Sequence, residues 1–144
     1  MNKLFFPAIM FLLSRNCLAD DTSGNLTIQI NGLHHARGKV IANLFREGDN
    51  VMKMETAYLH LQGKISEQHV QLVFQNLQYG KYAVTVFHDE NDNGYLDHNL
   101  LRMPAEPLGF SNGFQLGLSS GLPNFEKLQF VFGPGADTIG ITVK

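Results

Sequence analysis

The stretch Leu26-Thr27-Ile28-Gln29-Ile30-Asn31 alternates apolar and polar side chains, and it decides the fold class. Successive side chains of a strand point to opposite faces, so Leu26, Ile28 and Ile30 share one face of a half-buried β-strand. Six further strand-like runs follow, at residues 39–46, 51–64, 70–75, 82–87, 128–132 and 138–143. Seven strands without helical periodicity predict an all-β fold, a seven-stranded antiparallel immunoglobulin/transthyretin-like sandwich.

Two segments depart from the half-buried pattern. Residues 39–46 are apolar on both faces, which predicts a strand in the centre of a sheet. Residues 88–124 are rich in glycine and proline and show no strand or helix pattern. Loops of that length are uncommon in compact domains and are usually functional or disordered. Because the segment contains Tyr95, Phe110 and Phe114, we expect one long ordered loop, and we expect any functional site to lie there.

The first residues have the features of a secretory signal peptide. A positive charge at Lys3 precedes the apolar run Leu4–Leu13, and small residues precede Asp20. We expect cleavage after Ala19, with residues 20–144 forming a single β-sandwich domain. The run is too short to span a bilayer, so no membrane span is expected. The sequence predicts an exported protein of the periplasm or extracellular space; a lipid anchor at Cys17 is the alternative.

Cleavage there removes Cys17, the only cysteine, and with it thiol catalysis, thiolate metal sites and disulfides. It also leaves nine basic and 13 acidic residues, a net charge of −4. Neither this balance nor any basic cluster indicates a nucleic-acid partner. Motifs of the common hydrolases, phosphate-binding loops and zinc proteases are absent from the sequence, so we expect no enzyme activity and no catalytic residues.

The segment from His88 to Asp97 carries the strongest chemical signal. Oxygen-bearing side chains occupy positions one, three, five and nine of a calcium-type loop, and glycine occupies position six. Leu100 replaces the acidic residue of position twelve, so another oxygen must fold back from the long loop, and Glu106 is the acidic candidate. The predicted calcium ligands are Asp89, Asn91, Asn93, the Tyr95 carbonyl, Asp97 and Glu106.

Other interpretations of the same residues stay open. Asn93-Gly94 is a strong tight-turn signal, and solvated acidic neighbours need no metal. His88 and His98 flank the loop and could hold a transition metal together with Asp89 and Asp97, although a surface or hydrogen-bonded histidine is the commoner arrangement. The pair His34-His35 lies in a predicted turn and has the same two interpretations.

Three segments together resemble a known family. They are Phe74–Val84, which contains Leu77-Gln78-Tyr79-Gly80-Lys81-Tyr82-Ala83, then His88–Asp97, and Met103–Asn112, which contains Gly109-Phe110-Ser111-Asn112. Together they resemble the bacterial exported family catalogued as domain of unknown function 2141. The start of a strand in the first segment, Leu77–Ala83, which we call the strand entry, is on its own also similar to transthyretin-like and carboxypeptidase-regulatory sandwiches. Arg102-Met103-Pro104 stands where the family usually has Gly-Ile-Pro.

This resemblance implies a β-sandwich outside the cytoplasm, and it implies no particular activity. We therefore expect a non-enzymatic binding or accessory module with calcium as its one candidate cofactor. The alternative is a metal-independent cell-envelope interaction or structural domain. In both cases the expected partner is an unknown envelope or extracellular protein.

Overall fold

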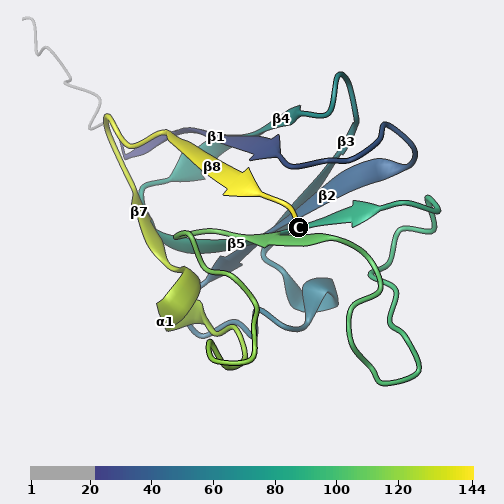
Figure 1. Cartoon of the computed structure of the whole chain (residues 1–144). Helices are drawn as coiled ribbons and strands as arrows, with labels where there is room; N and C mark the ends of the chain where they lie inside the picture. Colours follow the sequence, from purple (N-terminus) through teal and green to yellow (C-terminus); the bar gives the residue numbers. More distant parts are fainter. Residues whose placement is uncertain (1–21) are drawn as a thin grey trace, which may run out of the picture.

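Two β-sheets form the fold, which the computed structural model describes over residues 22–144 (Figure 1). The predicted signal peptide at residues 1–19 lies outside the described residues. The smaller sheet has three strands in the order β4 (Val70–Gln78), β1 (Ser23–Asn31) and β8 (Thr138–Thr142). The larger sheet has five: β3 (Leu59–Lys64), β2 (Lys39–Arg46), β5 (Gly80–Asp89) and β6 (Leu108–Phe110) follow one another, and β7 (Phe130–Phe132) also pairs with β5.

The main core lies between the two sheets. The predicted apolar face of β1 is confirmed, because Leu26, Ile28 and Ile30 are each fully buried. They belong to one cluster with Val84 and Val86 of β5, so the smaller sheet packs on the larger one in a sandwich-like arrangement. The other buried members of this cluster are Leu33, Val40, Ala42, Leu44, Val70, Leu72, Phe74, Leu77, Tyr82, Phe132, Ile141 and Val143.

A second apolar cluster covers the outer face of the larger sheet. Alternation along β2 and β5 sends Phe45 and Ala83 to this face, where they meet Val51, Phe110 and Leu128. The long loop and the short helix α1 (Phe125–Leu128) supply part of this cover. The predicted central strand is therefore confirmed: β2 lies between β3 and β5 and is buried on both faces.

The structure corrects the predicted number of strands from seven to eight. The additional strand, β6, lies inside the segment predicted to be a loop, and its three residues are too few to show an alternating pattern. Within residues 51–64 only β3 is a strand, and the 3-10 helix η1 (Met54–Thr56) precedes it. Within residues 128–132 the strand begins only at Phe130, because α1, whose N-terminus is capped by the Asn124 side chain, extends to Leu128.

The structure also corrects the predicted all-antiparallel sheet. β1 and β8 run parallel, with Ile28 paired to Ile139 and Ile30 paired to Ile141. Alternation in a sequence tells which side chains share a face, but it does not tell in which direction a distant strand runs. In residues 22–144 no helix has both the length and the apolar character needed to cross a bilayer.

Gly38 brings the connection between β1 and β2 against the end of β5. Its φ of 74° lies in the left-handed region, which favours glycine. A Cβ atom at this position would lie 1.9 Å from the Asp89 carbonyl oxygen. Only glycine therefore allows this approach, which places His35 and Arg37 beside the last residues of β5.

Gly38→Ala should lower the free energy of unfolding by at least about 2 kcal/mol, because the backbone strain is joined by overlap with Asp89. Gly48→Ala is the matched control: its φ is 93°, but no atom lies within 4 Å of the added Cβ. The control should cost only about 1 kcal/mol of strain. Urea unfolding of both variants measures the difference, and equal losses would contradict the close approach.

Candidate functional site

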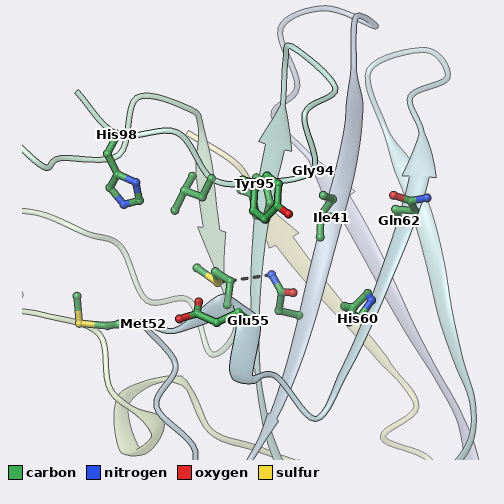
Figure 2. Close-up of a pocket in the computed structure, with 12 residues that line it drawn as sticks. Ile41, Met52, Glu55, His60, Gln62, Gly94, Tyr95 and His98 are labelled. Carbon is green, nitrogen blue, oxygen red and sulfur yellow. Dashed lines mark hydrogen bonds between the residues drawn. The ribbon is translucent and has the colours of Figure 1, made fainter. Parts of the chain in front are cut away.

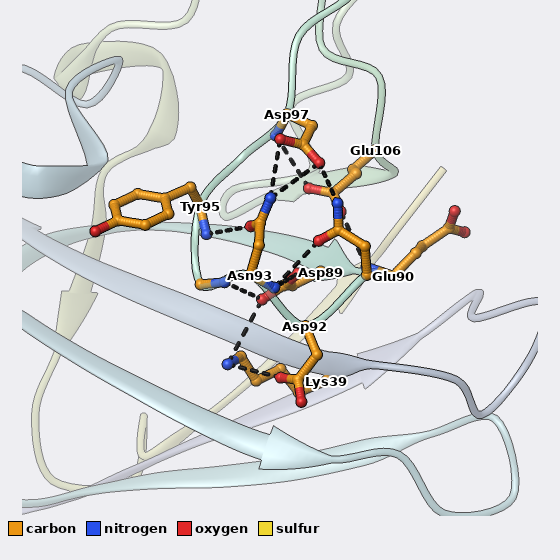
Figure 3. Close-up of polar contacts among 10 residues, drawn as sticks. Lys39, Asp89, Glu90, Asp92, Asn93, Tyr95, Asp97 and Glu106 are labelled. Carbon is orange, nitrogen blue, oxygen red and sulfur yellow. Dashed lines mark hydrogen bonds and ion pairs between the residues drawn. The ribbon is translucent and has the colours of Figure 1, made fainter.

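We call residues 89–97 the acidic turn. It begins at Asp89, where β5 ends (Figure 3). The Asp89 side chain is fully buried. Its Oδ1 accepts a hydrogen bond from the Asn93 backbone N–H at 3.0 Å, and its Oδ2 accepts one from the Gly94 N–H at 2.7 Å. A buried carboxylate needs such partners, because an unpaired one is costly to dehydrate. Asp89 therefore determines the shape of the turn that follows it.

Asn91 and Asn93 continue the turn with side-chain to backbone hydrogen bonds. Asn91 Oδ1 accepts from the Asn93 N–H at 3.1 Å, and Asn93 Oδ1 accepts from the Tyr95 N–H at 2.8 Å. With the oxygens used in this way, both side-chain amide groups donate to Asp97: Asn91 Nδ2 at 2.6 Å, and Asn93 Nδ2 at 3.1 and 3.2 Å to the two carboxylate oxygens. Gly94 makes the sharp bend between Asn93 and Tyr95, with a φ of 84°.

Glu106 returns from the long loop and closes the turn. It is 8% exposed. Its Oε1 accepts from the Glu90 N–H at 2.9 Å and its Oε2 from the Asp97 N–H at 3.1 Å, so one carboxylate bridges both ends of the turn. A further backbone bond joins Ala105 N–H to the Asp97 carbonyl at 2.8 Å. Residues 98–104 thus form an excursion whose two ends are held together.

The predicted ligand residues therefore meet at one place. Hydrogen bonds connect the side chains of Asp89, Asn91, Asn93, Asp97 and Glu106 through the turn, and Tyr95 joins through its backbone N–H while its side chain is 76% exposed. Each carboxylate oxygen of Asp89 and of Glu106 accepts one backbone N–H and keeps a second lone pair, whereas Asp97 Oδ2 already accepts from two side-chain amides. The set can offer hard oxygen ligands to a cation such as calcium once Asp97 exchanges its two amide donors for the ion.

Lys39 of β2 lies beside the turn and partly balances its charge. Its Nζ is 2.8 Å from Asp92 Oδ1 and 3.6 Å from Asp89 Oδ2. The hydrogen bond to Asp92 raises the pKa of the ammonium above its ordinary value and outweighs the opposing loss of hydration. Because the pKa is raised, this stabilisation is fully present below the ordinary lysine pKa and is lost as the pH rises through the raised value.

The histidines that lie together in the structure are not His88 and His98, the pair that the sequence suggested. Among the described residues, the His35, His88 and Glu90 ligand atoms converge, all within 4.8 Å of one another. His98 is exposed and lines a pocket. No local spacing points to the converging group, because His35 comes from the connection between β1 and β2. Only the close approach at Gly38 brings it to His88.

The Gly-Phe-Ser-Asn segment has a structural role. Phe110 and Ser111 are both buried. Ser111 Oγ donates to the Leu128 carbonyl at 2.6 Å and accepts from the Val84 N–H at 2.8 Å. These bonds join β5 to the end of α1 through the loop, as expected for a packed segment.

A pocket of 380 Å³ opens between the outer face of the larger sheet and the acidic turn (Figure 2). Ile41, His60 and Gln62 contribute the strand side of its lining, and Tyr95 and His98 contribute the loop side. The acidic turn therefore also positions one wall of a cavity. The remaining lining residues are Asn43, Met52, Met54, Glu55, Phe87, Gly94 and Leu96.

Comparison with known proteins gives one match. Neither the curated proteins nor the solved structures that were compared include a match to this chain. Residues 28–140, which include seven of the eight strands in full or in large part and the whole acidic turn, match the family described as "Uncharacterized protein conserved in bacteria (DUF2141)". The chain therefore belongs to the DUF2141 family, as its strand entry, acidic turn and Gly-Phe-Ser-Asn segment predict.

Proposed function

We propose that this protein is an exported, non-enzymatic binding or accessory module whose long loop presents an apolar surface to a partner protein. In this proposal residues 1–19 direct export to the periplasm or the extracellular space, and residues 20–144 act as one immunoglobulin/transthyretin-like domain. The composition of residues 1–19 and the lack of common catalytic motifs in the sequence support it.

The observation that carries the proposal is a group of exposed apolar side chains around one pocket. Met52, Met103, Leu116 and Leu122 are 50%, 54%, 41% and 66% exposed. All four line a pocket of 160 Å³ whose floor includes Leu108 and Phe110. We call these four residues the Met/Leu surface. Contiguous exposed apolar side chains mark interaction sites, and flexible methionines adapt to a partner's shape.

Calcium is the cation that we propose to strengthen this arrangement. The Met/Leu surface belongs largely to the long loop, and the loop is tied to β5 through Asp89, Asp97 and Glu106. A calcium ion among these oxygens would reduce the repulsion between the carboxylates and hold the loop more firmly. Because Asn side chains replace charged ligands at two positions, we expect a weak site, with a Kd of about 10⁻⁴ to 10⁻³ M.

The alternative, a metal-independent interaction or structural domain, also has a specific observation in its favour. Asp89, Asp97 and Glu106 each accept at least two hydrogen bonds from the chain itself. Lys39 adds a positive charge beside Asp89. These contacts can hold the turn without a cation, and the Met/Leu surface would then act in the same way at any calcium concentration.

Calcium at tenfold excess over its Kd should stabilise the protein by about 1.4 kcal/mol and raise the melting temperature by a few degrees. Asp97→Ala should abolish the rise, and so should Asp89→Ala if this buried position tolerates the change. Magnesium at the same concentration is the ionic-strength control, because it prefers a tighter octahedral shell. An equal rise with both ions, or none with calcium, would support the metal-independent domain.

The Met/Leu surface can be tested by affinity capture from an envelope extract. Leu122→Glu should lose a partner that the unchanged protein retains, because a charge in the apolar contact is costly to bury. Val131→Glu is the matched control: Val131 is also 66% exposed, but it lies in β7 and does not line the pocket. Equal capture by both variants would contradict a role for the Met/Leu surface.

A further inference from the structure

A second cluster of ligand-type side chains lies beside the acidic turn. It contains His35 from the connection between β1 and β2, His88 near the end of β5, and Glu90 just after it. Their ligand atoms lie within 4.8 Å of one another. None of the three belongs to the predicted calcium ligands, so the cluster needs an explanation of its own.

The hydrogen bonding of His88 leaves one of its nitrogens free to bind. His88 is 1% exposed, and its Nε2 lies 2.7 Å from the Arg37 carbonyl oxygen. A carbonyl can only accept, so Nε2 carries the proton and Nδ1 keeps its lone pair when the ring is neutral. Metal-binding histidines usually have this arrangement, in which the other ring N–H donates to a backbone carbonyl or a carboxylate and so orients the ring.

His35 contacts Glu90 directly through its Nε2, and in a site that uses both side chains as ligands an ion takes the place of this contact. His35 Nε2 lies 3.0 Å from Glu90 Oε1. His35 Nδ1 is buried and has no hydrogen-bond partner, although a buried polar atom is normally satisfied. The two rings are 4.8 Å apart between centroids. Two adjacent imidazoles, one with an unsatisfied buried nitrogen, are therefore placed beside a carboxylate.

We propose that His35, His88 and Glu90 form a binding site for a divalent transition-metal ion of the zinc type. Two imidazoles and one carboxylate suit zinc, and three protein ligands leave a fourth position for water. The side chains of His35 and Glu90 are 31% and 38% exposed, so an ion can reach the site from solvent. Binding draws the ligand atoms to about 3.3 Å from one another, the separation set by metal–ligand bonds of about 2 Å in a tetrahedron.

The backbone around the site holds two of the three ligands in place. Glu90 N–H donates to Glu106 Oε1 at 2.9 Å, which fixes the backbone at the start of the turn. Arg37, which orients His88, precedes the glycine that packs against Asp89. The site therefore depends on the same loop ends as the acidic turn, but it uses different side chains.

Zinc titration of the purified protein, made without a polyhistidine tag and followed by calorimetry, tests the proposal. We expect one equivalent of zinc to bind. His35→Ala and Glu90→Gln should each weaken binding at least about tenfold, since loss of an outer partner alone costs about 10- to 100-fold. His34→Ala is the matched control, because the neighbouring histidine is exposed and lies outside the cluster, and it should bind as the unchanged protein does.

Two further results separate this site from the proposed calcium turn. Asp97→Ala should keep its zinc binding, and His35→Ala should keep any calcium response. Because Glu90 is partly exposed, Glu90→Gln should fold even if His35→Ala does not. Circular dichroism checks the fold of each variant. No zinc binding by the unchanged protein, or equal binding by the His35→Ala and His34→Ala variants, would overturn the site and leave His35 and Glu90 as a simple ion pair.

Discussion

The hydrogen bonds that the buried Asp89 carboxylate accepts from Asn93 and Gly94 are the contacts on which the rest of the site depends. Asp89 ends the strand that pairs with three others, so its position is fixed by the sheet. A charge buried there is stable only with its partners in place, and those partners are backbone groups of the next turn. One side chain thus transmits the rigidity of the sheet to the loop.

Glu106 extends this effect to the other end of the excursion. Because its two oxygens bind the N–H groups of Glu90 and Asp97, the chain must return to β5 before it continues into β6. That return brings Phe110 onto the outer face of the larger sheet and Ser111 to the backbone of β5. The face needs a cover because β2 and β5 carry apolar side chains on both sides, and the loop supplies it. Met103, Leu116 and Leu122 remain exposed on the same loop, and together with Met52 they form the Met/Leu surface.

The parts of this structure that rest on a regular pattern could be predicted from the sequence. Alternation located β1, β4 and β5, and the two apolar faces of residues 39–46 identified β2 as the central strand. The family followed from three short segments. The spacing of Asp89, Asn91 and Asn93 also indicated a turn, and the lack of an acid at Leu100 pointed to Glu106 as the residue that folds back. Metal binding there stays a prediction.

Features that depend on contacts between distant segments could not be predicted in this way. β6 has only three residues and no readable period, and its strand character comes from pairing with β5. β8 runs parallel to β1, its partner strand, and no local signal in the sequence encodes this direction. The cluster of His35 with His88 depends on the absence of a Cβ at Gly38, which allows two connections to touch. Each of these outcomes is a tertiary constraint that a local pattern does not contain.

Amide hydrogen exchange across residues 88–124 is the measurement that tests the central claim most directly, made on the unchanged protein and on Glu106→Ala. Two buried carboxylates acting as the anchors of the loop should give slow exchange at the N–H groups of Glu90, Asn93, Gly94 and Asp97. Glu106→Ala should speed exchange of Glu90 and Asp97 at least about fivefold, since an unmet hydrogen bond costs about 1–3 kcal/mol, while the strands of the smaller sheet keep their protection. Fast exchange of these four groups in the unchanged protein would contradict the account.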